Sequence, residues 1–402
     1  MADLHPFRAV RPTPDAITEV CSAPYDVVST QEARQLALGR SRSFFRVIRP
    51  EVELPDTDDP HAPEVYQRGA ANMKGFIEAD YTVREAAPAL YVYRVDTGTR
   101  MQTGIFGCVS VQDYDEGVIV KHEETRPDKV HDRARHMELQ QAHAEPVMLT
   151  YEGRGSVDAL VNKTVEREPL YDFQDGDTQH TLWRVETPET WKQAFADVNR
   201  LYIADGHHRC KAASRVAQSY AASSTDRPEA HVFPAVLFPM RDMHIMAYNR
   251  VLSGLGVDPG TFLDRLADRY TLERSVPYDT PRQKGHVCIY ARGEWHDLTL
   301  PRAAGPRTVD TLDVTRLTKG VLAPILNVTN PRSDDRLGYV GGIAGAQALK
   351  KKVDGGEEEI AISMYPTAIE ELAAVSDDGD LMPPKSTWFE PKLISGMLVH
   401  TF

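Results

Sequence analysis

The chain has 402 residues, of which 41% are hydrophobic and 26% are charged, and its formal net charge is −13 at pH 7. A chain of this length can bury a sizeable core, and we expect it to fold as two or more lobes. The acidic balance excludes a general phosphate-backbone binder, because nucleic-acid binding depends on basic patches. Small-molecule ligands are therefore favoured over nucleic acid.

The cysteines are widely separated in the sequence and form no Cys-x-x-Cys pair, so they predict neither a zinc knuckle nor a disulfide framework. They are Cys21, Cys108, Cys210 and Cys288. The first residues lack a basic and then apolar signal segment, and no apolar run is long enough to span a membrane. We therefore expect a cytoplasmic protein without a membrane partner.

Residues 1–155 are predicted to form an N-terminal α+β lobe. A strand is expected at 44–48 and a helix at 64–78, on either side of an acidic, proline-containing loop. β-branched and aromatic residues then predict strands. These strands cover 89–93, 104–109, 117–120 and 146–150.

The segment 121–143 is far more hydrophilic than its flanks and begins where a predicted strand ends, a common position for ligands in open α/β sheets. Glu123 suits a general base or a magnesium ligand. Basic residues of the segment could balance phosphate charge. These are Lys121, Arg126, Lys129 and Arg133. The alternative is a solvated, salt-bridged helix that begins after Pro127, and composition alone favours it.

Strands and helices alternate from 156 to 257, which predicts a small α/β unit. Helices are expected at 157–165 and 188–196, and extended segments at 181–185 and 232–238. Between them, an apolar strand at 201–204 leads into a polar turn and then a helix over 211–222. The turn reads Asp205, Gly206, His207, His208 and Arg209.

The residue types of this turn suit a phosphate-binding site with an acid and two imidazoles beside it. Gly206 allows a tight turn and a close approach to a ligand, and the N–H groups and dipole of the following helix favour an anion. Arg209 adds a fork of donors suited to phosphate or carboxylate. The alternative is an ordinary capped helix, and the motif alone supports the two interpretations about equally.

Residues 258–402 are predicted to form a C-terminal α+β region. Its expected elements are a helix at 261–270, a hairpin at 287–300 turning at Arg292-Gly293, a helix at 309–321, a strand at 360–364 and a helix at 367–375. The segment 382–392 is dense in proline, lysine and aromatic residues. It could be a lid whose Lys385 meets phosphate, or a tail whose aromatic residues pack against the body.

Several segments, in order along nearly the whole chain, together resemble the bacterial and archaeal family called domain of unknown function 1015. They are 24–28 (PYDVV), 44–51 (FFRVIRPE), 121–126 (KHEETR), 181–185 (TLWRV), 204–209 (ADGHHR) and 384–389 (PKSTWF). Because that family is poorly characterised, the resemblance transfers little function.

The motif at 205–209 also resembles the signature of free-serine kinases, which share a superfamily with sulfiredoxin and the nucleotide-binding domain of ParB. This resemblance covers about 188–240 and implies that the turn and the helix start bind nucleotide phosphates with magnesium. The expected fold is therefore α/β (mixed α+β), with mixed-sheet lobes around a ParB/sulfiredoxin-like unit at 156–257. This chain differs from the free-serine kinases in size, because those kinases are compact and this chain is much longer.

The leading hypothesis is a Mg²⁺-dependent phosphotransferase that moves a phosphoryl group between ATP or ADP and a small hydroxylated metabolite, with free serine or phosphoserine first. Phosphoryl transfer needs mainly positioning and charge neutralisation. Asp205 and Glu123 would hold the metal, His207 and His208 would contact phosphate or move protons, and Glu123 or Asp26 would accept the hydroxyl proton.

Two alternatives stay open. A nucleotide-binding switch of the ParB type would form a homodimer that depends on nucleotide and would transfer little or no phosphate. A phosphate-ester hydrolase would use water in place of the metabolite hydroxyl and would need no nucleotide.

Overall fold

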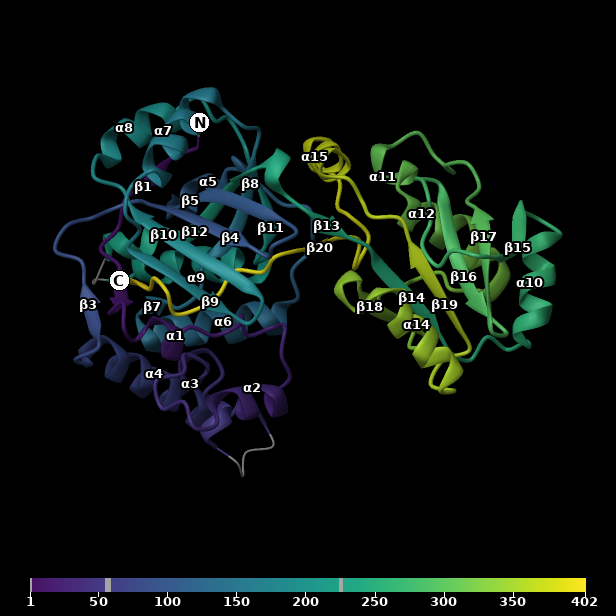
Figure 1. Ribbon diagram of the computed structural model, residues 1–402, viewed down its shortest axis with the longest axis horizontal. Coiled ribbons are helices and arrows are strands. Elements are labelled where there is room, and N and C mark those ends of the chain that lie inside the picture. The colour runs from purple at the N-terminus through teal and green to yellow at the C-terminus, as the bar shows by residue number, and fades with distance from the viewer. Residues whose placement is uncertain (1, 55–58, 224–226) are drawn as a thin grey trace. The chain divides into compact units, whose positions relative to one another are not determined.

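The computed structural model describes residues 2–54, 59–223 and 227–402 (Figure 1). The chain forms two compact units, the first from residues 1–243 and 391–402 and the second from residues 244–390. The predicted boundaries near 155 and 257 do not coincide with this division. The reason is that strands from both sides of residue 155 belong to one sheet.

The first unit is built on a mixed sheet whose strands run in the order β6-β11-β8-β12-β5-β4-β10-β9, with β1 also paired to β5. The described strands are β1 (Leu4–His5), β4 (Tyr91–Asp96), β5 (Met101–Ser110), β6 (Ile119–Val120), β8 (Val147–Tyr151), β9 (Tyr171–Asp175), β10 (Thr178–Arg184), β11 (Leu201–Asp205) and β12 (Val232–Pro239). β6 runs parallel to β11 and β8 parallel to β12, whereas the other neighbours are antiparallel. This arrangement confirms the predicted mixed α/β class.

Helices cover this sheet through a continuous apolar core. Buried side chains of four helices pack with those of the strands. The helices are α5 (Val111–Asp115), α7 (Gly155–Val165), α8 (Pro188–Phe195) and α9 (His207–Ala221). A separate apolar seam joins α9 to α6 (Pro127–Gln140) through Ala134, Met137, Ala212 and Val216 (Figure 1). The polar segment 121–143 therefore contains the predicted helix after Pro127, but that helix is half buried.

Helices at the start of the chain, most of them short, form a second layer of the unit. They are α1 (Ile17–Val20), α2 (Thr30–Ala37), α3 (Phe45–Ile48), a 3-10 turn at Pro50–Glu53 and α4 (Pro63–Glu78). Two small ladders pair β2 (Val10–Pro12) with β3 (Thr82–Arg84), and β7 (Ala142–His143) with β21 (His400–Thr401).

The predicted strand at 44–48 is wrong, because Phe45–Ile48 form α3 and Phe44 is its N-cap residue. The Phe44 N–H donates to the Val20 carbonyl, and the Phe44 ring packs 5.2 Å from that of Phe76. Phe45, Val47 and Ile48 are buried as well. An apolar run of this length looks the same in a buried strand and in a helix covered on several sides, so its pattern does not separate the two.

The second unit carries an antiparallel sheet with the strand order β15-β17-β16-β19-β14-β18. Its strands are β14 (Tyr248–Leu252), β15 (Leu272–Val276), β16 (His286–Ala291), β17 (Glu294–Thr299), β18 (Leu337–Gly341) and β19 (Ile360–Met364). Its helices are α10 (Pro259–Ala267), α11 (Thr308–Thr311), α12 (Asp313–Leu317), α13 (Ala323–Leu326), α14 (Gly345–Asp354) and α15 (Ile369–Asp377). A further short pair joins β13 (Ile245–Met246) to β20 (Trp388–Phe389).

The predicted hairpin at 287–300 is confirmed by β16 and β17. Its turn places Arg292 and Gly293 at φ 54° and 86°, the left-handed conformation that a two-residue hairpin turn requires. The predicted helix at 309–321 is interrupted at Leu312, whose ψ of 138° breaks it into α11 and α12. A π-helical turn at Thr318–Leu322 follows.

Among the residues described, no helix has both the length and the apolar character needed to cross a bilayer. All four cysteines are buried and free.

We predict that buried His180 makes the first unit sensitive to acid. Its Nδ1 lies 2.7 Å from the Tyr93 hydroxyl, and burial lowers the pKa of this imidazole to about 4. Because the unfolded chain takes up a proton near pH 6.5 and the folded chain does not, the stability contributed by neutral His180 is lost as pH falls from about 7 toward 4. The His180→Asn variant should therefore lose about 2 kcal/mol less free energy of unfolding between pH 7 and pH 5 than the parent.

Chemical denaturation at the two pH values measures this difference. The matched control is His131→Asn on the exposed face of α6, which replaces a histidine that is not buried. An unchanged pH dependence in His180→Asn would contradict the prediction.

Candidate functional site

The two polar segments singled out in the sequence meet at one edge of the large sheet. β6 and β11 run parallel, with Ile119 opposite Leu201 and Val120 opposite Tyr202. Their carboxyl ends therefore lie at the same edge, and the loop 121–126 comes next to the turn 205–209. This is the position at which open α/β sheets commonly bind ligands.

Gly206 makes the junction between strand and helix possible. It has φ 103°, a conformation that L side chains rarely adopt, and a Cβ added there would lie 2.9 Å from Val147 Cγ1 and 3.1 Å from Arg209 Nε. The helix α9 begins at the next residue, His207, earlier than predicted, and no side chain caps its N-terminus. The first N–H groups of this 15-residue helix thus lack a side-chain acceptor at the N-cap.

Asp205 forms ion pairs with two cations from different parts of the chain. One carboxylate oxygen lies 3.1 Å from Lys392 Nζ and the other 2.6 Å from Arg209 Nη2. Burial opposes ionisation of Asp205, but the charges of Lys392 and Arg209 outweigh burial and lower the pKa of this carboxyl. Asp205 is therefore a fixed anion whose side chain is 23% exposed.

Arg209 has less access to solvent than a phosphate ligand needs. It is 5% exposed, and besides Asp205 its guanidinium donates to the Pro146 carbonyl. The structure thus places Arg209 beneath Asp205, where it fixes the carboxylate.

A second buried carboxylate, Glu145, lies beside this network. Its Oε1 accepts the Tyr25 N–H at 3.2 Å and the Ser395 hydroxyl at 3.0 Å. Burial raises the pKa of Glu145, while Arg209 and then Arg133 oppose that rise. Glu145 therefore fastens both the loop that carries Asp26 and the C-terminal segment to the sheet edge.

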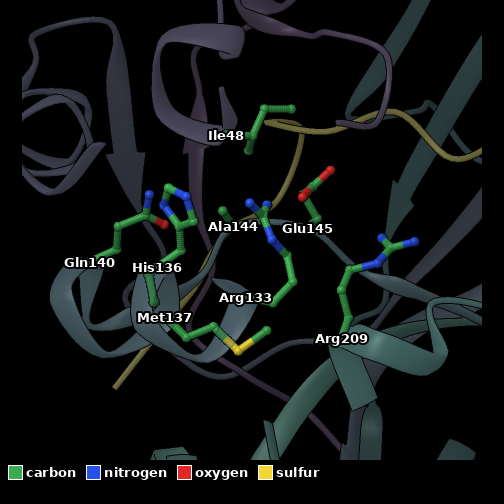
Figure 2. A pocket seen from close by; sticks show the side chains of 9 residues that line it. Ile48, Arg133, His136, Met137, Gln140, Ala144, Glu145 and Arg209 are labelled. Carbon is green, nitrogen blue, oxygen red and sulfur yellow. The ribbon is translucent and has the colours of Figure 1, made fainter. Parts of the chain in front are cut away.

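Arg133 and Glu145 line a small cavity together with Arg209 and side chains of α6 (Figure 2). Its volume of about 20 Å³ is room for roughly one water molecule. The Arg133 guanidinium is bound by Asp132 at 2.6 Å and stacks 4.1 Å from the Tyr25 ring. A nucleotide does not fit in this cavity.

The histidine pair holds the loop 121–126 against α9. Nε2 of His207 accepts the backbone N–H of His122 at 3.4 Å, and Nε2 of His208 accepts that of Arg126 at 3.1 Å. Burial lowers the pKa of all three imidazoles at positions 122, 207 and 208, to about 4 for His122. Both members of the pair are thus neutral acceptors that position the loop.

Two further predicted residues lie within electrostatic range of the pair. Asp26 is exposed, and its charge partly offsets the lowered pKa of His208 and adds to the raised pKa of Arg209. The positive charge of Lys129 has the opposite effect and lowers the pKa of His208 further. The structure therefore brings Asp26 and Lys129 to the rim of the site.

The other predicted cations have partners elsewhere. Arg126 is paired with Asp128 at 2.7 Å on the exposed surface. Lys121 Nζ lies 3.9 Å from the centre of the Tyr114 ring, and burial together with Lys211 lowers its pKa. Lys385 belongs to the second unit, where its ammonium lies 5.4 Å from the Tyr248 ring.

The predicted magnesium pair of Asp205 and Glu123 does not fit the arrangement. Both oxygens of Asp205 face cations. Glu123 instead groups with His122 and His207, and one ligand atom from each lies within 4.8 Å of the others. This set is two-thirds imidazole, whereas Mg²⁺ prefers oxygen ligands.

Sequence reasoning missed two residues of the site, Lys392 and Glu145. Lys392 lies in the segment rich in proline and lysine, but nothing in that segment distinguishes it from Lys385 as the lysine that reaches the site. Glu145 directly precedes the apolar strand at 146–150. A charged residue next to a buried strand is the local feature that could have identified it as a site residue.

Comparisons with known proteins place the chain in a family and give distant structural likenesses. The family model described as Protein of unknown function (DUF1015) matches residues 4–315. No curated protein matches the chain.

Among solved structures, SbnI with a C-terminal truncation from Staphylococcus aureus is 11% identical, with a TM-score of 0.38 over 72% of this chain and 85% of that chain. A free serine kinase in complex with AMP is 11% identical, with a TM-score of 0.37 over 73% of this chain and 92% of that chain. A conserved hypothetical protein from Pyrococcus furiosus is 12% identical, with a TM-score of 0.37 over 73% and 95%.

We predict that Gly206→Ala destabilises the first unit. The new Cβ would meet Val147 while the backbone stays in the left-handed region, so strain and overlap add, and the free energy of unfolding should fall by at least about 2 kcal/mol. Thermal or chemical denaturation measures the loss. Gly176→Ala is the matched control, because Gly176 also has a positive φ (58°) but a Cβ there meets nothing within 4 Å. Equal losses in the two variants would show that the contact with Val147 is unimportant.

Proposed function

The chain belongs to the DUF1015 family of proteins of unknown function, and we propose that its first unit is a nucleotide-dependent phosphotransferase. Its acceptor is a small hydroxylated metabolite, with free serine as the first candidate. The nucleotide, ATP or ADP, binds as its magnesium complex, so this magnesium arrives with the substrate.

The uncapped start of α9 is the observation that carries the proposal. Gly206 directs the chain into the helix without a side chain at the junction, which leaves the first N–H groups and the helix dipole to face an anion. Lys392 adds a positive charge at this point, with its side chain 20% exposed beside Asp205. Phosphoryl transfer needs little more from a protein than such positioning and charge neutralisation.

The Asp205 network orients these groups. Arg209 fixes the carboxylate from below, and the carboxylate holds Lys392 at the helix start, where its ammonium can meet the transferring phosphoryl group. His207 and His208 hold the loop 121–126 rather than the phosphate. Arg209 is therefore assigned a positioning role instead of the phosphate contact that the sequence suggested.

The transfer step can be written with its atoms balanced. The acceptor hydroxyl oxygen attacks the terminal phosphorus of the nucleotide, and the bond from that phosphorus to the bridging oxygen breaks. The nucleotide leaves with one phosphate fewer. The exposed carboxylate of Asp26 accepts the hydroxyl proton, because it lies at the rim within electrostatic range of His208 and Arg209. The choice of serine as the acceptor rests on the Asp-Gly-His-His-Arg motif at 205–209, which resembles the signature of free-serine kinases.

The direct prediction is transfer of label from nucleotide to serine. Purified chain is incubated with Mg²⁺ and ATP or ADP labelled in the terminal phosphate, and products are separated with serine, with threonine or glycerol, and with no acceptor. We expect labelled phosphoserine. Release of inorganic phosphate from phosphoserine without nucleotide would instead indicate a hydrolase. Nucleotide-dependent dimerisation without transfer would indicate a switch, and absence of both transfer and nucleotide binding would refute the proposal.

Two variants separate the proposed roles. Asp26→Asn should lower kcat by about 100-fold or more with nucleotide affinity retained, since it removes a proton acceptor. Lys392→Gln should weaken both nucleotide binding and transfer, because it removes a charge from the phosphate site. Lys163→Gln, at an exposed position of α7, is the control and should keep parental kinetics. Parental kinetics in both Asp26→Asn and Lys392→Gln would contradict the assignment of these residues.

A further inference from the structure

Three side chains between the loop 121–126 and the start of α9 form a cluster that the phosphotransfer step does not use. His122 and Glu123 follow β6, and His207 opens α9, so two separate segments of the first unit contribute. One ligand atom from each of the three lies within 4.8 Å of the others. The His122 and His207 rings stand nearly perpendicular, with centroids 4.3 Å apart.

One imidazole nitrogen of the cluster has no visible partner. Nδ1 of His122 is buried and finds no hydrogen-bond partner among the described residues. His122 as a whole is 2% exposed and His207 is 5% exposed. The backbone N–H bond to His207 Nε2 is long, at 3.4 Å. Native proteins satisfy buried polar atoms of this kind with protein groups, water or an ion.

We propose that His122, Glu123 and His207 bind a divalent transition-metal ion such as Zn²⁺. Two neutral imidazoles and one carboxylate form a donor set that suits zinc and its first-row neighbours, whereas Mg²⁺ takes oxygen ligands. Three protein ligands leave a coordination position open, which is the composition of zinc sites that bind water or a substrate.

Charges of both signs act on the cluster. The negative charge of Asp205 acts on His122, and the positive charge of Lys121 acts on His207. Asp205 itself stays outside the ligand set, since Lys392 and Arg209 occupy its two oxygens. The ion would also link the loop to the helix start more firmly than the long His122–His207 bond does. Binding of the ion does not depend on the phosphotransferase activity.

Zinc binding to the complete chain tests the proposal without nucleotide. The protein is stripped with a chelator, the chelator is removed, and Zn²⁺ affinity is measured by competition with a fluorescent zinc indicator. We expect one tight site that 1,000-fold excess Mg²⁺ does not displace. Glu123→Gln should weaken binding by about 100-fold, in the range that loss of a metal-site interaction produces. The neighbouring Glu124→Gln, at an exposed position, should bind Zn²⁺ as the parent does.

Cobalt provides a second, spectroscopic readout of the same site. Co²⁺ bound by two imidazoles and a carboxylate should give visible absorption bands, which His122→Asn should abolish. Because Glu123 is partly exposed, Glu123→Gln should retain the parent's melting temperature even if His122→Asn does not. Equal Zn²⁺ affinity in the parent and Glu123→Gln, displacement by Mg²⁺, or no binding by the parent would overturn the proposal, and each result is independent of whether phosphate is transferred.

Discussion

One buried guanidinium, that of Arg209, connects the parts from which the site is made. It pairs with Asp205 at the end of β11 and donates to the Pro146 carbonyl just before β8. These are neighbouring antiparallel strands whose register shifts between Ile203 and Asp205, so the ladder itself is irregular at this point. Arg209 bridges the irregularity. Removing one partner of a buried pair typically costs roughly 3–5 kcal/mol, because the other charge is left without compensation. The position of Asp205, and through it that of Lys392, therefore depends on Arg209.

The histidines contribute through their neutral form. An imidazole nitrogen accepts an N–H only when it carries no proton, and burial keeps the pKa of His207 well below its ordinary value. The loop 121–126 is consequently fixed by α9 through acceptors that sit on a packed helix. Side chains placed on rigid elements hold a site more precisely than side chains on loops. The same neutrality leaves these rings available as metal ligands, since a protonated imidazole cannot coordinate an ion.

The sequence predicted the parts of the site that are local and missed those that are not. The apolar run before Asp205 and the need for glycine at position 206 are visible within a few residues, and both appear in the structure as β11 and a left-handed turn. The parallel pairing of β6 with β11, which brings 121–126 to the turn, follows only from the complete sheet. Lys392 is 187 residues from its partner Asp205, and no local pattern encodes a contact at that separation. The strand predicted at 44–48 failed for the related reason that burial by distant elements, here α4, decides between strand and helix in a short apolar run.

The return of the chain to the first unit explains how such a distant residue reaches the site. The chain leaves this unit after residue 243 and re-enters it at residue 391. At these crossings β13 and β20 pair, and the Glu390 N–H donates to the His244 carbonyl at 3.1 Å, so the second unit begins and ends at neighbouring points. An insertion with adjacent ends places little strain on its host. The last residues then bind the first unit at several places, through Lys392, through Ser395 on Glu145, and through Val399, whose N–H donates to the Val10 carbonyl. The family match ends at residue 315, yet the cation that completes the Asp205 network comes from beyond it. The Asp205 network is therefore completed within the unit of residues 1–243 and 391–402, and a fragment that ended with the family match would lack Lys392.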